Sequence, residues 1–141
     1  MYEKYTRQSL PIKKYRELLG SAICVFNSNN SFVIENILKN DSNNEYNWYD
    51  LIDKTSGRII PAIEKTISKV AGNEIAILFD ELVQIRNRIV HSYRVTSSNG
   101  EQVLCTKDDK NIQLIITEDY LYGFIHKNEK LSDLLHIFRG Y

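Results

Sequence analysis

The sequence of 141 residues has few of the residues that cross-link or interrupt small proteins: two cysteines, two prolines and six glycines. Cys24 and Cys105 are too few for a disulfide framework, and their apolar neighbours suit buried, reduced thiols. No apolar stretch approaches the roughly 18 to 20 residues that a membrane-spanning helix needs. We therefore expect a soluble protein of a reducing compartment, the cytoplasm.

Charge of one sign is not in excess, since 18 Lys and Arg balance 18 Asp and Glu. A chain without net charge is not attracted as a whole to nucleic acid or to an anionic membrane, so a site for a polyanion must be a local cluster of positive residues. The sequence also lacks a glycine-rich phosphate loop, a G-x-S-x-G elbow, an H-E-x-x-H helix and paired cysteines. Nucleotide hydrolysis, serine hydrolysis and zinc peptidase activity therefore have no support.

What the chain has in abundance is apolar residues at helical spacing, first from about Ser9 to Lys39. The polar run Asn27–Ser31 interrupts this pattern and predicts either two helices or one long helix with a weak middle. An Asn-, Asp- and Ser-rich stretch from Lys39 predicts a loop. The pattern then predicts a short helix from Trp48 to Thr55, with Asn47 as its N-cap.

The second half of the chain has the clearest helix, predicted from Glu74 to about Tyr93 after a helical stretch that ends at Gly72. Two β-favouring runs, Gln102 to Thr106 and Ile112 to Thr117, flank a polar turn and predict a hairpin. A final helix begins at Glu118, with a break expected near Asn128.

These elements predict a mainly α fold. We expect an up-and-down bundle of about four or five helices, with a β-hairpin inserted before the last helix. The length suits one domain, which we place at residues 1–141.

The richest cluster of functional groups lies at the end of the clearest helix, where residues 86–94 hold three arginines, a histidine, an asparagine and a tyrosine. Asn87 and His91 share a helix face, whereas Arg86 and Tyr93 fall about 20° apart at the edge of the apolar stripe. One interpretation is structural: Arg86 pairs with a carboxylate, His91 caps the helix and Tyr93 fills the core.

The same groups also suit RNA cleavage. An imidazole that titrates near neutral pH can move the proton of a 2′-hydroxyl, and a guanidinium can neutralise charge that builds on the phosphate. Such chemistry needs no metal and no cofactor. Histidines outside this cluster, His126 and His136, lack matching Cys or carboxylate spacing, so we expect surface or core residues rather than zinc ligands.

The aromatic residues offer a second candidate surface for nucleic acid. However, the nine tyrosines and Trp48 are scattered from Tyr2 to Tyr141 and are not interleaved with a basic run. We expect most of them in the core or in interfaces.

The run from Arg86 to His91 matches the R-x4-H signature of the HEPN family, including the polar residue that commonly follows the arginine. With Tyr93 it extends to R-x4-H-x-Y, which resembles the toxins of HEPN/MNT toxin-antitoxin pairs. This resemblance implies a metal-independent endoribonuclease, a toxin or phage-defence effector that cleaves RNA as a homodimer and leaves a cyclic phosphate and a free 5′-hydroxyl. The expected hairpin is not part of the family's core.

The resemblance also implies roles for single residues. Arg86 would stabilise the phosphate, His91 would be the acid and base, and Asn87 would orient His91 or the substrate. Arg88 and Arg94 would add contacts to the RNA.

For Tyr93, similarity to the HEPN/MNT pairs implies that it accepts AMP from a nucleotidyltransferase antitoxin, which would block the place of the RNA phosphate. A tyrosine at this position is also a good packing residue. Two further alternatives remain open. The first is a non-catalytic HEPN module that binds RNA, a nucleotide or a protein partner, and the second is a structural helical dimer in which the motif is a coincidence.

Overall fold

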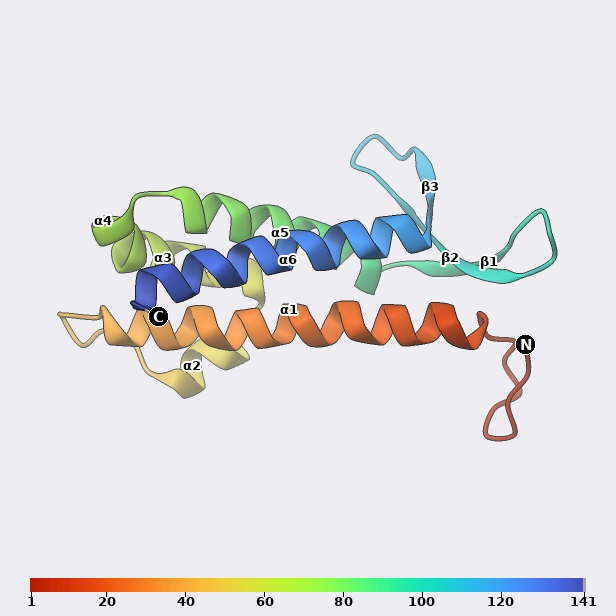
Figure 1. Cartoon of the computed structure of the whole chain (residues 1–141), viewed down its shortest axis with the longest axis horizontal. Coiled ribbons are helices and arrows are strands. Elements are labelled where there is room, and N and C mark those ends of the chain that lie inside the picture. Colours follow the sequence, from red (N-terminus) through yellow and green to blue (C-terminus); the bar gives the residue numbers. More distant parts are fainter. Residues whose placement is uncertain (141) are drawn as a thin grey trace.

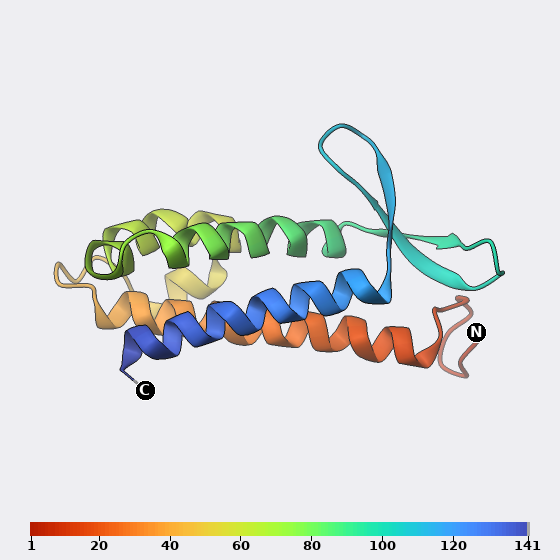
Figure 2. The same cartoon turned by 45° about the horizontal axis from the view of Figure 1, so that its top comes forward.

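The computed structural model describes residues 1–140, which form a helical bundle with a small sheet at one end (Figure 1). Three long helices build the bundle: α1 (Lys13–Lys39), α5 (Glu74–Val90) and α6 (Glu118–Arg139). Helices α1 and α6 run in the same direction and α5 runs against both (Figure 2). The predicted mainly α fold, with β structure inserted before the last helix, is confirmed.

The short elements between α1 and α5 lie toward the end of the bundle that is away from the sheet (Figure 1). They are α2 (Trp48–Asp53), a 3-10 helix (Ser56–Ile59), α3 (Ile60–Lys65) and α4 (Ile67–Ala71). As predicted, the Asn47 side chain caps α2 by accepting a hydrogen bond from the backbone N–H of Asp50 (2.9 Å). Gly72 ends α4 with a positive φ of 82°, a conformation in which glycine pays no Cβ penalty.

The centre of the core is a group of three phenylalanines, one from each long helix. The Phe26 ring of α1 stacks against Phe79 of α5 and Phe124 of α6, with centroids 6.1 Å apart in both pairs. All three side chains are fully buried. Because each ring belongs to a different helix, their burial holds the three helices together.

The polar middle of α1 is accommodated without a break, so the chain forms one helix from Lys13 to Lys39. Asn29 is buried, and its Nδ2 donates to the backbone oxygen (2.8 Å) and to Oδ1 (3.0 Å) of Asn128 on α6. Asn128 in turn donates to the Phe124 carbonyl at 3.0 Å. This paired arrangement explains why the break predicted near Asn128 is wrong: the amide bonds across the interface and does not disrupt its own helix.

The sheet has three antiparallel strands in the order β1 (Tyr93–Thr96), β2 (Gln102–Lys107) and β3 (Gln113–Ile116). The predicted hairpin corresponds to β2 and β3, whereas β1 was not expected. The prediction that the preceding helix runs to about Tyr93 is wrong, because α5 ends at Val90 and Tyr93 pairs with Cys105 of β2. Residues 93–96 are aromatic or β-branched apart from one arginine, which suits a strand.

Tyr15 of α1 fixes the sheet to the bundle. Its hydroxyl donates to the Ile116 carbonyl of β3 (2.6 Å) and accepts from the backbone N–H of Leu104 on β2 (3.3 Å). Burial raises the pKa of this hydroxyl above its ordinary value. The side chain therefore joins two strands to the helix, and the bond that it donates to Ile116 needs the neutral form of its hydroxyl.

Two other expectations concern the surface. Cys105 is buried as expected, but Cys24 is exposed on α1, so its expected burial is wrong; neither cysteine is in a disulfide. None of the helices formed by residues 1–140 is long and apolar enough to cross a membrane.

Candidate active site

The first residue of the motif, Arg86, lies on the buried side of α5. Its guanidinium carbon is 5.2 Å from the centre of the Phe26 ring, a cation–π contact with α1. Its Nε is buried and has no hydrogen-bond partner within residues 1–140. Desolvation lowers the pKa of Arg86 from its ordinary value, yet a guanidinium remains charged at neutral pH.

The carboxylate partner that the structural interpretation requires for Arg86 is absent from the described part of the chain. The ion pairs there join Lys14 to Glu118, Arg16 to Glu3 and Lys127 to Glu81. The guanidinium carbon lies over the Phe26 ring, but the ring does not replace the hydrogen-bond acceptors that the guanidinium N–H groups can use. Arg86 is thus a partly buried cation with a buried Nε that has no hydrogen-bond partner and with no carboxylate beside it, a state that favours an anionic ligand.

Three other side chains within residues 1–140 carry a buried polar atom without a partner: Asn36, Ser68 and Arg139. An orphaned atom alone therefore does not mark a site. Arg86 differs because it is also one end of the R-x4-H run, which brings a histidine and an amide to the same end of α5.

His91, the other end of the motif, is exposed and forms the C-cap of α5. Its backbone N–H donates to the Asn87 carbonyl at 3.0 Å, which confirms that the two residues lie one helical turn apart. Neither side chain bonds to another residue in the described range, so the imidazole and the amide are available to a ligand. At 100° per residue, Val90 and Asn87 lie between Arg86 and His91 in an arc of about 140°.

The two arginines assigned to RNA contact lie away from that arc. Arg88 donates through Nη1 to the Lys107 carbonyl of β2 (2.9 Å) and borders an open pocket of about 550 Å³ that Tyr120 also lines. Burial raises the pKa of Tyr120, an effect that the positive charge of Arg88 opposes. Arg94, on β1, donates to the Ser9 carbonyl of the N-terminal segment (2.7 Å). The structure therefore groups Arg86, Asn87 and His91 and separates them from Arg88 and Arg94.

Tyr93 also leaves the helix. The expectation that it lies beside Arg86 on a helical wheel is wrong, because α5 ends before it and Tyr93 begins β1. The residue is 41% exposed, so it does not fill the core either. Contact with the Cys105 side chain raises the pKa of its hydroxyl. The phenol is accessible two residues beyond His91.

Sequence reasoning missed Phe26, the residue that holds Arg86 in place. Phe26 stood out only as one of many apolar residues in its helix, and no local signal links positions 60 residues apart. The histidines outside the motif are as expected: His126 is exposed, and the His136 ring packs on Phe32 at 4.8 Å. Across residues 1–140, no three His, Cys, Asp or Glu side chains gather where they could hold a metal ion.

Comparison with protein-family models, curated proteins and solved structures finds no match to this chain. The function must therefore be argued from the motif and its surroundings alone.

Proposed function

We propose that the protein is a metal-independent endoribonuclease of the HEPN type, in which Arg86 binds the scissile phosphate and His91 transfers protons. The observation that carries the proposal is the state of Arg86, which packs on Phe26 with a buried Nε and has no carboxylate beside it. A desolvated cation without a counter-ion destabilises a fold, and groups with perturbed pKa values gather at functional sites. A bound phosphate would supply the missing counter-ion.

The reaction follows from the chemistry of these groups. His91 takes the proton of a ribose 2′-hydroxyl, and the 2′-oxygen attacks the adjacent phosphorus. The bond from phosphorus to the 5′-oxygen breaks, and that oxygen takes a proton from an imidazolium. Arg86 stabilises the charge on the non-bridging oxygens in the transition state. The products are a 2′,3′-cyclic phosphate and a 5′-hydroxyl.

A second copy of the chain would complete the site. Val90 is 52% exposed and lies within the arc between Arg86 and His91. Packing of two α5 ends against each other would cover Val90. It would also bring the partner's His91 toward Arg86, so that one imidazole acts as the base and the other as the acid.

The accessible phenol of Tyr93 supports regulation by a nucleotidyltransferase partner, as in a toxin-antitoxin pair. In the proposed step, the Tyr93 oxygen attacks the α-phosphorus of ATP and pyrophosphate leaves. Since contact with Cys105 raises the pKa of Tyr93, the hydroxyl is protonated at neutral pH and the partner must supply a base. The attached phosphate would place negative charge beside His91 and repel the RNA.

The test is incubation of the purified protein with total RNA in excess chelator, followed by analysis of the fragment ends. We expect 5′-hydroxyl ends from the wild type, and a loss of about 10²- to 10⁴-fold in rate for His91→Ala. His126→Ala is the matched control, because His126 is exposed on α6 outside the motif, and its activity should be unchanged.

Cleavage by His91→Ala at the wild-type rate would refute the proposal, as would intact RNA with every protein. RNA that is bound and left intact would favour the non-catalytic binding module.

A further inference from the structure

The chain is neutral overall, but its first 16 residues carry five Lys and Arg against a single acid, Glu3. Residues 1–12 precede α1 and form what we call the N-terminal arm. The arm lies at the sheet end of the bundle (Figure 1). The net charge of the whole sequence does not reveal a local excess of positive charge, yet such an excess determines whether a surface attracts polyanions.

Hydrogen bonds hold the arm in a defined shape. Tyr2 and Ser9 form an antiparallel bridge that closes the arm into a loop. Arg16, one turn into α1, donates through Nε to the Pro11 carbonyl (2.8 Å) and pairs through Nη2 with Glu3 (2.7 Å). Arg16 of α1 therefore neutralises the one acid of the arm, and the arm's bases, Lys4 and Arg7, are left unopposed.

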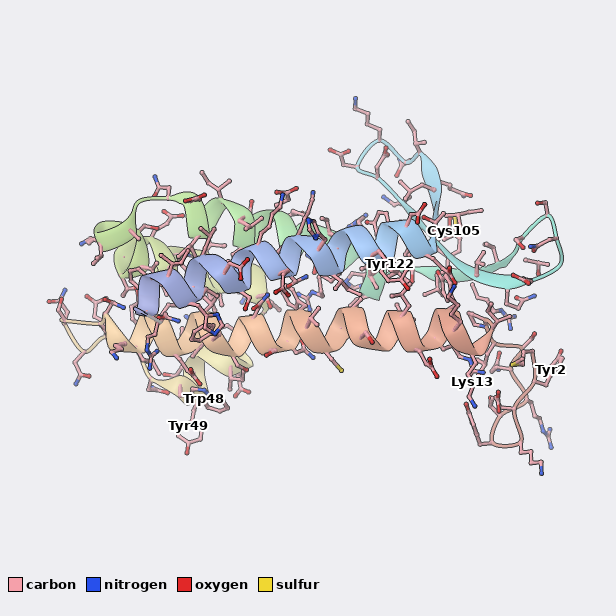
Figure 3. All side chains as sticks on the ribbon, viewed as in Figure 1. Tyr2, Lys13, Trp48, Tyr49, Cys105 and Tyr122 are labelled. Atoms are coloured by element: carbon pink, nitrogen blue, oxygen red, sulfur yellow. The ribbon has the colours of Figure 1, made fainter. Side chains whose placement is uncertain are left out.

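Three of the five bases among the first 16 residues have no ion-pair partner anywhere in residues 1–140. They are Lys4, Arg7 and Lys13, and all three are exposed. Figure 3 shows Lys13 and Tyr2 at the same free end of the molecule. Lys14, by contrast, pairs with Glu118 at 3.5 Å. Lys4 and Arg7 lie in the arm and Lys13 begins α1 next to it, so these three unpaired cations gather at the sheet end of the bundle.

Two exposed tyrosine rings belong to the same arm. Tyr2 is 73% exposed and Tyr5 is 74% exposed, and the Tyr5 hydroxyl accepts a bond from Arg16 Nη1 (3.1 Å). Five of the eight tyrosines within residues 1–140 are exposed, so most of them do not lie in the core. The expectation of core positions is therefore wrong for these five. Tyr141 lies outside the described residues. We call Tyr2, Lys4, Tyr5, Arg7 and Lys13 the basic face.

The basic face is joined to the candidate active site through the first strand. Arg94 of β1 donates to the Ser9 carbonyl at 2.7 Å, which ties the strand to the arm. His91 precedes Arg94 by three residues, which is about 10 Å of extended chain. The contact between Arg94 and Ser9 therefore joins the arm to the strand that follows His91.

We propose that the basic face binds single-stranded RNA, with Lys4, Arg7 and Lys13 on the phosphates and the two tyrosine rings stacked on bases. The inference rests on the proposed function, which supplies RNA as the ligand. Cations that follow a backbone, together with aromatic rings that take any base, are the means by which proteins hold single strands. Bases paired in a duplex are not open to such stacking, so a single strand is preferred over a duplex.

The test measures binding apart from cleavage. The probe is a fluorescently labelled, single-stranded 2′-O-methyl RNA, which has no 2′-hydroxyl to attack the phosphate. For the variant Lys4→Gln/Arg7→Gln/Lys13→Gln, we expect weaker binding and a plot of log affinity against log salt that is shallower by about 2. The matched control is Lys54→Gln/Lys65→Gln/Lys69→Gln, which removes as many exposed charges from the other end and should bind like the wild type.

The rings are tested in the same assay. Tyr2→Ala/Tyr5→Ala should weaken binding by at least about fivefold for each ring. Tyr49→Ala, which removes an exposed ring from α2, should have no effect. Tyr5→Phe loses the bond from Arg16 but keeps the ring, so it should bind the probe like the wild type. Weak binding by this variant would show that Tyr5 supports the structure of the arm and does not stack on a base. That result would overturn the role of Tyr5.

Wild-type affinity in the basic-face variants would overturn the proposal. So would equal competition by duplex RNA, or binding to phosphatidylserine vesicles without binding to the probe. The two proposals fail in different ways. If His91→Ala binds the probe and no protein cleaves RNA, the basic face stands and the nuclease does not; if RNA is cleaved but the variants bind normally, only the basic face is refuted.

Discussion

Two of the polar groups in the interior of the bundle are treated in opposite ways by the fold. Asn29 and Asn128 are buried between α1 and α6 and bond to each other. Arg86, on α5, lies against the core residue Phe26 and has an Nε that bonds to nothing in the described chain. The fold itself explains the two asparagines, because they bond to each other. Arg86 is a cation that the fold holds in place without giving its Nε a hydrogen-bond partner.

The asparagine pair has a structural use. Its bonds form only when position 29 of α1 is opposite position 128 of α6, so any sliding of one helix along the other would leave buried amides unpaired. Such a penalty specifies register between helices, a role that buried polar residues also have in coiled coils. No comparable contact explains Arg86, which is why we assign it to a ligand.

The largest expected effect separates these two groups by activity. Arg86→Met should lower the cleavage rate by at least about 10²-fold, because the phosphate loses its cation. The free energy of unfolding should stay the same or rise, since an apolar side chain can pack on Phe26 without a desolvated charge. Single-turnover cleavage and urea unfolding measure the two quantities.

Arg139→Met provides the matched control for that prediction. Arg139 also has a buried, unpartnered guanidinium nitrogen but lies outside the motif, at the end of α6. Its replacement should leave cleavage unchanged. A large loss of stability in Arg86→Met, with normal cleavage, would instead make Arg86 a structural residue.

The second prediction concerns the asparagine pair and is expected to affect stability only. Asn29→Ala removes the donor to Asn128 and leaves a buried oxygen without a partner, which should lower the free energy of unfolding by about 1–3 kcal/mol. Asn27→Ala, at an exposed position in the same helix, should change it by no more than about 0.5 kcal/mol. Cleavage per folded molecule should be normal in both. Equal stability of the two variants would remove the contrast drawn with Arg86.

The helices could be predicted from the sequence because apolar spacing is a local signal that the core uses directly. The surroundings of the polar residues could not. Asn29 bonds to a residue 99 positions away, and Arg86 packs on a residue 60 positions before it. From the sequence alone, Asn29 could only be a weak point in a helix, and Arg86 could be the partner of a carboxylate or of a phosphate.

The strand β1 was missed for the same reason. Tyr93 follows closely on a strong helical pattern, so the predicted helix extends to include it. Its strand partner, Cys105, lies across a turn in β2 and gives no local signal. The motif therefore located Arg86, Asn87 and His91 correctly on one helix end. It misjudged the setting of Tyr93, which depends on strand pairing.

The smallest expected effect comes from a third polar group, Tyr15, which is satisfied like the asparagines but can also ionise. Tyr15→Phe loses the bonds to Ile116 and Leu104 and should lower the free energy of unfolding by about 1 kcal/mol. Burial raises the pKa of Tyr15, so the folded state holds this proton more tightly than the unfolded state. The resulting stability is complete below the ordinary tyrosine pKa, about 10, and is lost as pH rises through the folded value.

Urea unfolding at a series of alkaline pH values should therefore show a fall in stability that is smaller in Tyr15→Phe than in the wild type. Tyr120→Phe is the control, because burial also raises the pKa of Tyr120 but its hydroxyl has no hydrogen bond to the sheet. If the wild type and Tyr15→Phe fall equally, the hydroxyl of Tyr15 does not hold the sheet, and the orientation of β1 beside His91 must depend on Arg94 and the N-terminal arm instead.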